Sequence, residues 1–402
     1  MRTGDRDLIR DLNISIVLNT IRQHQPIART EIAARTGLSP ATVTGITARL
    51  LAEGWIREAG FGEASGGRRP ILLRLDARSR FSVGVKLAAD EVSAAVGDLG
   101  ADLLEVVTLP LPQEAPGIVE QVAEAVLRAL RGAGVARSAV IGVGVALPGV
   151  VDPVRGLSLF APWHPWEHFP LKSQLEERLG LPVLLENDAN AFTLAERWFG
   201  AGRGAHHLVG VMISAGIGAG VVIDGHVYRG AAYAAGEIGH LVVEPEGPAC
   251  VCGQHGCLEA VAGDRALARE GARLLQAGRA PVLARLAGGD PARVRRQEVV
   301  EAARRGDAAC RQLLERAGET IGRAVAAMVN TLNPEAVVVG GGLPDQAGPL
   351  LLEPLRRAVD RHAFHAPGHS FRVLPAGLGE RAWLVGALTL AVEEAFRAPI
   401  PV

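Results

Sequence analysis

Four residues able to ligate a metal ion lie within residues 240–257, and this cluster constrains the fold more than any other stretch. His240 is followed by Cys250, Cys252 and Cys257, in the order H-x9-C-x-C-x4-C. Three thiolates and one imidazole are the ligand set of a closed tetrahedral zinc site, which holds a shape and does no chemistry because no position is open to water. Cysteines one residue apart are poor disulfide partners. We therefore predict one structural zinc ion per chain in preference to a disulfide or ordinary buried thiols.

The residues around the cluster resemble a known family. Gly236-Glu237-x-Gly-His240 is followed by C-x-C-G-x-x-G-C-L-E, which ends at Glu259. This run is similar to the signature of the ROK family, which comprises sugar kinases and sugar-responsive transcriptional repressors. The resemblance extends over nearly the whole chain. It implies an α/β two-lobed actin-like fold (ribonuclease H-like, as in sugar kinases), and it leaves open whether the chain is a kinase, a repressor or both.

Composition limits the class of protein. The chain has 402 residues, 48% of them hydrophobic, which is enough for two or three domains with their own cores. Apolar runs are interrupted by Gly, Pro or charge well before the length that crosses a bilayer. Asp5, Asp7 and Asp11 stand where a signal peptide would be apolar. We expect a cytoplasmic protein with no membrane partner.

Charge is unevenly distributed along the chain. Residues 1–80 carry 13 Arg and 8 Asp or Glu, whereas the remainder carries 29 basic and 35 acidic residues. A basic head on an acidic body indicates that only the head meets a polyanion.

The first 80 residues have the pattern of a winged helix-turn-helix. Apolar residues recur at helical spacing over 7–24, Gly37 marks a turn, and Ser39-Pro40 is a pair that begins helices. Small, mostly polar residues remain on the outward side of the second short helix, and they suit base edges and phosphates in a major groove. We predict DNA contacts at Ser39, Ala41, Thr42, Thr44 and Thr47. A helical hairpin of this kind can also be mere packing.

The segment after Trp55 favours DNA binding over packing. Strand-forming residues flank a Gly- and Ser-rich tip that ends in Gly67-Arg68-Arg69-Pro70. Two arginines on an extended backbone suit a narrow minor groove, where the potential of A·T-rich DNA is most negative. The tip also resembles the wing of ROK repressors. We predict that Arg68 and Arg69 contact a double-stranded operator.

From residue 81 onward the pattern changes to alternating strands and helices. Strands are expected at 82–87, 91–97, 103–109 and 139–146, and a related set at 208–213, 218–223, 226–228 and 336–340. Such duplication is typical of two actin-like lobes around a cleft. Helices are expected over 264–277, 293–304 and 307–330, with 281–290 as a connection. The expected domains are a head at 1–80, lobe I at 81–185 joined by a C-terminal helix within 379–402, and lobe II at 186–378.

One loop departs from the pattern of the family's kinases. Those enzymes turn their first strand at D-x-G-G-T, where the aspartate organises metal-ATP and the glycines let backbone amides reach phosphate. Aligned on Gly84-Val85, this chain has Lys86-Leu87-Ala88-Ala89-Asp90. A base replaces the acid, side chains replace both glycines, and an acid stands where phosphate would approach. We expect ATP and Mg²⁺ binding to be lost, although Ser214–Gly220 and Gly340-Gly341-Gly342 remain glycine-rich.

The resemblance also implies a sugar site. Asn187 and Asp188 match the strand-to-helix corner whose aspartate is the general base of the kinases, and Asp188 would be catalytic if kinase activity survived. Glu237, His240 and Glu259 match positions that hold sugar hydroxyls. As a purely structural alternative, Asn187 and Asp188 would cap the following helix. His240 would serve both the zinc ion and the sugar.

A second departure affects the ligand. Where the kinases often have A-P-N-L-G-W, this chain has Ala161-Pro162-Trp163-His164-Pro165-Trp166. Trp163 replaces a hydroxyl-binding asparagine, and its indole can stack on a sugar ring or simply pack in the core.

These observations predict a sugar-responsive DNA-binding regulator, a repressor of carbohydrate-utilisation genes. Its expected partners are an operator, a sugar or sugar phosphate between the lobes, and a second copy of the chain, as a homodimer or a dimer of dimers. The alternatives are an ATP-dependent sugar kinase of the hexokinase or glucokinase type with an added head, and a scaffold that binds a protein through its body.

Overall fold

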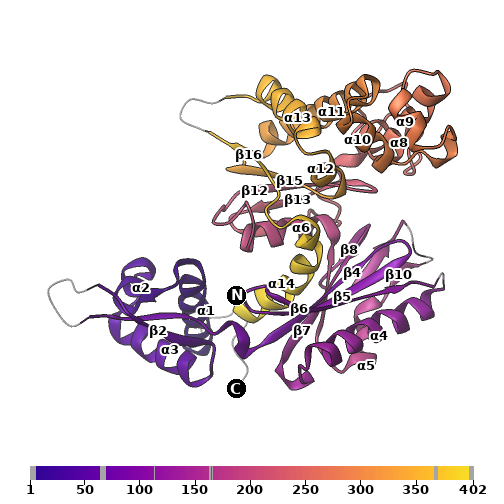
Figure 1. Cartoon of the computed structure of the whole chain (residues 1–402). Coiled ribbons are helices and arrows are strands. Elements are labelled where there is room, and N and C mark those ends of the chain that lie inside the picture. The colour runs from indigo at the N-terminus through magenta and orange to yellow at the C-terminus, as the bar shows by residue number, and fades with distance from the viewer. Residues whose placement is uncertain are drawn as a thin grey trace. The chain divides into compact units, whose positions relative to one another are not determined.

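The computed structural model describes residues 6–63, 69–112, 114–162, 164, 166–365 and 370–397. It divides into two compact units, shown with their elements in Figure 1. Unit 1 comprises Met1–Asp188 and Leu384–Val402, and unit 2 comprises Ala189–Trp383. Both divisions fall inside helices, α6 (Asp188–Trp198) and α14 (Ala382–Arg397). The two units are therefore joined by continuous helical backbone.

The head within unit 1 is a winged helix-turn-helix. It has helices α1 (Arg6–His24), α2 (Arg29–Thr36) and α3 (Pro40–Ala52), and a sheet in the order β1 (Ile27–Ala28), β3 (Ile71–Leu75), β2 (Ile56–Phe61). The turn follows the expected chemistry: Gly37 ends α2 with φ 70°, and the Ser39 hydroxyl accepts from the Thr42 amide at 3.1 Å to cap α3.

Thr47 corrects the predicted DNA-contacting face of α3. Its side chain is fully buried, donates to the Val43 carbonyl at 2.8 Å and accepts from the Arg29 Nε at 2.9 Å. Residues four apart share one helical face, and Val43 already faces the core. Thr47 therefore holds the start of α2 against α3, and the prediction that it points outward is wrong.

The body of unit 1 is built on a mixed five-stranded sheet. A three-strand antiparallel meander is extended by two strands that run parallel to its first strand. In spatial order the strands are β11 (Val183–Asn187), β7 (Val140–Leu147), β4 (Phe81–Leu87), β5 (Glu91–Asp98) and β6 (Leu103–Pro110).

The two faces of this sheet are covered differently. Val83, Val85 and Val145 pack against the apolar sides of α4 (Ala115–Ala133) and α5 (Leu171–Leu179). Side chains alternate between faces of a strand, so Gly84 and Gly144 lie on the other face. There α14 packs so closely that a Cβ on Gly144 would stand 1.8 Å from the Ala387 carbonyl oxygen.

Unit 2 repeats the same sheet topology. Its antiparallel meander is again extended by two strands parallel to the first. The spatial order is β14 (His226–Tyr228), β13 (Ile217–Ile223), β12 (Leu208–Ile213), β15 (Ala336–Gly340) and β16 (Arg372–Pro375). Read in the opposite direction, from β16 to β14, this is the order found in unit 1, so the expected two-lobed actin-like fold is confirmed.

Unit 2 also covers its two sheet faces in the same manner. Val209, Val211 and Val339 belong to a core made with the helices on one side. On the other side α6 lies on Gly210 and Gly220, each of which would place a Cβ 2.2 Å from the Thr193 Oγ1. The remaining helices are α7 (Leu258–Ala262), α8 (Asp264–Gln276), α9 (Pro281–Leu286), α10 (Arg296–Arg304), α11 (Ala308–Leu332), α12 (Gly342–Ala347) and α13 (Pro349–His362).

Three details differ from the sequence expectation. The segment expected as a connection contains α9, because Pro281 starts a helix whose Leu283 is fully buried. A small sheet of β8 (Val150–Asp152), β9 (Leu157–Phe160) and β10 (Glu167–Phe169) was not predicted, nor was β16. Strands of three or four residues carry too few alternations to give a periodic signal. No helix in the described part of the chain is long and apolar enough to cross a membrane.

Candidate functional site

The four predicted metal ligands come together in unit 2. One ligand atom from each of His240, Cys250, Cys252 and Cys257 lies within 4.8 Å of the others. The Cys250 Sγ is 3.6 Å from the His240 Nδ1, and the Cys252 and Cys257 sulfurs are 3.7 Å apart. The group can hold a metal ion.

The backbone that carries these ligands depends on one glycine. Gly256 has φ 68°, and a Cβ there would stand 1.5 Å from the Glu244 carbonyl oxygen. The Cys250 amide donates to the Gln254 carbonyl at 2.8 Å, and Val242 forms an isolated bridge with Cys257. The loop thus folds back on the segment after His240, which brings the histidine to the cysteines.

Three of the predicted sugar ligands also lie near one another in unit 2. The His240 Nε2 is 3.9 Å from the Glu237 Oε2, on the side of the ring opposite the cysteines. Burial raises the pKa of Glu237, while His240 lowers it and Glu259 raises it further. The Glu259 Oε2 accepts from the Ile217 amide at 3.0 Å. His240 therefore faces the cysteines with one nitrogen and a carboxylate with the other, as its double role requires.

The other two predicted sugar ligands belong to unit 1. Asn187 ends β11 and donates its Nδ2 to the Gly149 carbonyl at 3.0 Å, which ties the strand end to the Pro148-Gly149 loop. Asp188 is the first residue of α6, where a carboxylate favours the positive end of the helix dipole. Asp188 can therefore both stabilise the start of α6 and bind a ligand.

The segment predicted to stack on a sugar is only partly described. Trp163 lies outside the described residues. The next residue, His164, is buried, and burial lowers its pKa, whereas a hydrogen bond to the Ala88 backbone raises it. Within the described chain its Nε2 has no hydrogen-bond partner. The aromatic neighbour Trp166 stacks on Phe169 with ring centroids 4.6 Å apart.

The first hairpin of unit 1, where the sequence departs from the kinases, has a tightly closed turn. Lys86 pairs with Ser93 inside the sheet, and the Ala88 amide donates to the Glu91 carbonyl at 2.9 Å, which closes the turn on itself. Ala89 and Asp90 are exposed at its tip. The backbone amide at Ala88 is thus already used, and the Asp90 carboxylate is exposed beside it.

The exposed face of α3 consists of small residues. Ser39, Ala41 and Thr44 are exposed and Thr42 is half-buried. The sequence reading missed Gly45 and Ala48, which are exposed on the same face. The available signal was their spacing, because Gly45 lies four residues after Ala41 and Ala48 four residues after Thr44.

The wing carries a further basic pair that the sequence did not reveal. Arg69 is exposed, as expected, and Arg68 lies outside the described residues. Arg57 of β2 stands directly opposite Arg74 of β3, and both side chains are exposed. Like charges at paired positions destabilise a sheet, so an anionic partner such as DNA would stabilise this arrangement.

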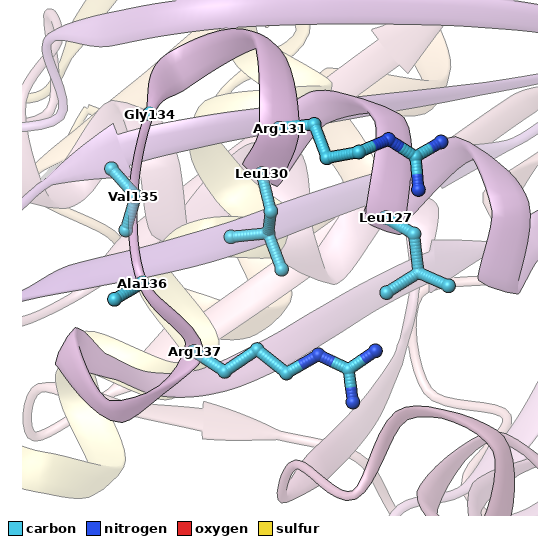
Figure 2. Close-up of a pocket in the computed structure, with 7 residues that line it drawn as sticks. All are labelled: Leu127, Leu130, Arg131, Gly134, Val135, Ala136 and Arg137. Carbon is cyan, nitrogen blue, oxygen red and sulfur yellow. The ribbon is translucent and has the colours of Figure 1, made fainter.

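Two surface hollows lie apart from these residues. The one in Figure 2 measures about 400 Å³ and lies where α4 ends at Gly134. Its Arg137 already donates to the Leu179 carbonyl and its Arg131 to Glu124. The second, of about 710 Å³, is lined by four arginines and four glutamates of unit 2: Arg269, Arg273, Arg316, Arg323, Glu244, Glu246, Glu270 and Glu319. None of the predicted site residues lines either hollow.

Two family models match the chain. Residues 82–394 match the ROK family, and residues 16–58 match the MarR family. The first match covers the body described above, and the second covers most of the helix-turn-helix.

Two relatives that match nearly the whole chain are transcriptional regulators by name. A xylose repressor of Caldicellulosiruptor bescii is 29% identical over 398 residues, covering 98% of this chain and 99% of that protein. The DNA-binding transcriptional dual regulator NagC of Escherichia coli is 31% identical over 398 residues, covering 96% and 94%.

Two solved structures resemble this chain to different extents. A ROK family transcriptional regulator described as a homologue of E. coli MLC superposes with a TM-score of 0.84 at 26% identity, covering 98% of both chains. A ROK family glucokinase from Streptomyces griseus, in complex with glucose and AMPPNP, superposes with a TM-score of 0.71 at 35% identity. That enzyme covers only 78% of this chain, although 99% of its own length is matched.

Proposed function

We propose that this chain, which belongs to the ROK family, is a sugar-responsive transcriptional repressor. One observation carries the conclusion. The matches to repressors run through the DNA-binding head and cover nearly the whole chain, whereas the glucokinase accounts for little more than the body. The head is thus the part that distinguishes this chain from an enzyme of the same fold.

The partner of the head is a double-stranded operator. The α3 face formed by Ser39, Ala41, Thr42 and Thr44 reads the major groove, and Arg68 and Arg69 enter the minor groove. Arg57 and Arg74 contact the backbone phosphates between them. Two heads on a palindromic operator require a homodimer, or a dimer of dimers.

The effector is a sugar or a sugar phosphate. Its hydroxyls are bound by Asn187 and Asp188 of unit 1 and by Glu237, His240 and Glu259 of unit 2, with Trp163 as a stacking residue. Carboxylates accept hydrogen bonds from hydroxyls, and an imidazole nitrogen can accept or donate one.

The metal in the His240, Cys250, Cys252 and Cys257 cluster is zinc. With zinc–sulfur bonds of about 2.3 Å, a tetrahedral site places its sulfurs roughly 3.8 Å apart. The observed separations of 3.7 Å and 3.6 Å match the edges of such a tetrahedron. Zinc would hold His240 in place and so support the sugar site.

Helix α14 gives the head a contact by which it can respond to the body. Within unit 1, the Phe396 carbonyl near its end accepts from the Ser15 hydroxyl of α1 at 2.6 Å. The Phe396 ring meets Trp55 edge to face with centroids 6.2 Å apart, and the Arg80 guanidinium lies 4.0 Å over the same tryptophan. At its other end, the Trp383 Nε1 donates to the Met212 sulfur in unit 2. A change that moves the end of α14 would therefore move the head.

The proposal is tested by operator release. The chain is bound to genomic fragments, the recovered operator is used in a gel-shift assay, and a sugar and sugar-phosphate panel is added. We expect at least one member to release the DNA, with the response lost in Asp188→Asn. Replacing Arg68 and Arg69 by Ala should weaken operator binding about 100-fold or more. A head that binds no duplex would overturn the proposal.

A second candidate function is an ATP-dependent sugar kinase. Asp188, at the position of the kinases' general base, and the 35% identity to the glucokinase favour it. The closed turn at Lys86 to Asp90 opposes it. A coupled ADP-release assay over the same panel separates the two, since sugar-dependent turnover abolished by Asp188→Asn would establish the kinase.

A further inference from the structure

Three helices of unit 2 begin at one point beside the glycine-rich loop after β15. Asp264 is the first residue of α8, Arg296 the first of α10 and Gly342 the first of α12. β12 and β15 are parallel, so they end at the same edge of the sheet, close to these starts. In open α/β sheets this edge is where phosphate groups bind.

The guanidinium of Arg296 fills the space next to the loop. A Cβ on Gly342 would stand 2.7 Å from its Nη1 and 3.1 Å from its Nη2. The same Nη1 donates to the Asp264 Oδ2 at 2.7 Å, and the two side chains are only 17% and 20% exposed. The space that a glycine leaves open is therefore occupied by an internal ion pair.

This ion pair does not use all of its polar atoms. The Asp264 Oδ1 and the Arg296 Nε are buried and have no hydrogen-bond partner within the described chain. Buried polar atoms without partners cost free energy, and each one calls for an explanation. The Arg296 Nε is a donor, so an oxyanion larger than one carboxylate could accept from it as well as from the Nη1.

A second carboxylate adds negative charge at the neighbouring loop. The Glu259 Oε2 would stand 2.7 Å from a Cβ on Gly216 and accepts from the Ile217 amide. Its charge and, above all, burial raise the pKa of Asp264 to about 6. An incoming phosphate would meet both carboxylates.

We propose that Asp264 is an internal anion that takes the place of a nucleotide phosphate on Arg296 and thereby closes the glycine loop of unit 2 to nucleotides. This inference rests on the proposed loss of nucleotide binding, which the unit 1 hairpin alone suggested. The inference adds a second feature, in unit 2. Arg296 could bind an anion there, but its guanidinium is already paired with the Asp264 carboxylate. The two units thus exclude nucleotide by different means.

The proposal predicts a gain of binding. Asp264→Asn keeps the side-chain shape, removes the charge and frees Arg296. A unit charge about 4 Å away at an effective dielectric constant of about 20 changes binding by about 1000-fold. Calorimetry of the full chain with inorganic pyrophosphate, and separately with ADP, should show binding by Asp264→Asn at least about 100-fold tighter than by the unmodified chain. Adding Arg296→Met should abolish the gained binding.

Three controls distinguish a loss of the ion pair from misfolding and from failure of the proposed repressor function. Asp290→Asn makes the same charge change at another helix start of unit 2, where the side chain only caps Ala292, and should gain nothing. Asp264→Ser serves if Asp264→Asn does not fold. Operator release by sugar is measured on each variant, so that failure of the repressor is recognised separately. Pyrophosphate binding by the unmodified chain within tenfold of the variant would overturn the inference, as would folded Asp264 variants that bind no anion.

Discussion

The two units have the same sheet and differ in what surrounds it. In each, a meander is extended by two parallel strands, one face is covered by a helical core, and a helix lies on glycines of the other face. The hairpin of unit 1 has no glycine from Lys86 to Asp90, whereas the corresponding turn of unit 2 has Gly216. Unit 2 carries the metal cluster, and unit 1 carries the head.

This difference shows which features the fold needs and which a function adds. The glycines at Gly84, Gly144, Gly210 and Gly220 permit close helix–sheet packing and occur in both units. The turns that follow the first strands have no such packing duty, so their residues can change with function. The predictions below test each contrast in turn.

Removing the metal should produce the largest effect and confine it to unit 2. Closing a structural zinc site contributes roughly 10 kcal/mol in small zinc domains. A chelator, or Cys250→Ser with Cys252→Ser, should therefore expose the backbone amides of 238–262 to hydrogen exchange while those of the unit 1 sheet stay protected. Cys310→Ala is the control, because Cys310 is a buried core residue outside the cluster. Metal analysis finding far less than one zinc per chain after gentle purification would contradict the assignment.

Replacing a sheet glycine by alanine should destabilise unit 1 more than unit 2. The two glycines, Gly144 and Gly210, each lie under a closely packed helix. Gly144→Ala places its Cβ against the Ala387 backbone, which cannot rotate away, so we expect a loss of more than about 3 kcal/mol. Gly210→Ala meets the Thr193 side chain instead, and about 1–2 kcal/mol is expected. Denaturant unfolding measures both. Thr193→Ala should rescue Gly210→Ala, and a larger loss at Gly210 than at Gly144 would refute the contrast.

Shortening Phe396 should uncouple the head without stopping DNA binding. Phe396→Ala removes the edge-to-face contact with Trp55, and such pairs contribute about 0.5–1.5 kcal/mol beyond burial. We expect operator affinity within about fivefold of the unmodified chain and a reduced release by sugar. Phe199→Ala, just beyond the end of the counterpart helix α6, should leave the response intact. An unchanged response in Phe396→Ala would exclude this contact from signalling.

The last contrast is a pH dependence of unit 2. The folded-state pKa of Asp264 is raised from 3.8 to about 6, chiefly by burial. An acid with a raised pKa contributes stability below its unfolded pKa that is lost as pH rises through the folded value. The unfolding free energy of the unmodified chain relative to Asp264→Asn should therefore fall by roughly 1–3 kcal/mol from pH 4 to pH 7. A flat difference would contradict the shift.

Much of the fold could be predicted because its elements carry strong local signals. The strands β12, β14 and β15 have the expected bounds, and α8 and α11 lie within two residues of theirs. Thr47 was misassigned because small polar residues look exposed in a sequence, while burial on α3 depends on which neighbours share its face. The strands β8, β9 and β10 were missed because each pairs with a partner that local periodicity does not specify.

The candidate sites also include features that the local sequence determines and features that only the tertiary structure reveals. The sequence by itself determined the His and Cys cluster that can hold a metal ion, the capping of α3 and the unusual hairpin, since each lies within a short stretch of chain and follows from side-chain chemistry. The tertiary structure alone decided the shared strand order, the opposition of Arg57 and Arg74, and the pairing of Asp264 with Arg296. These partners are separated by many residues, and only long-range packing fixes which backbone segments meet.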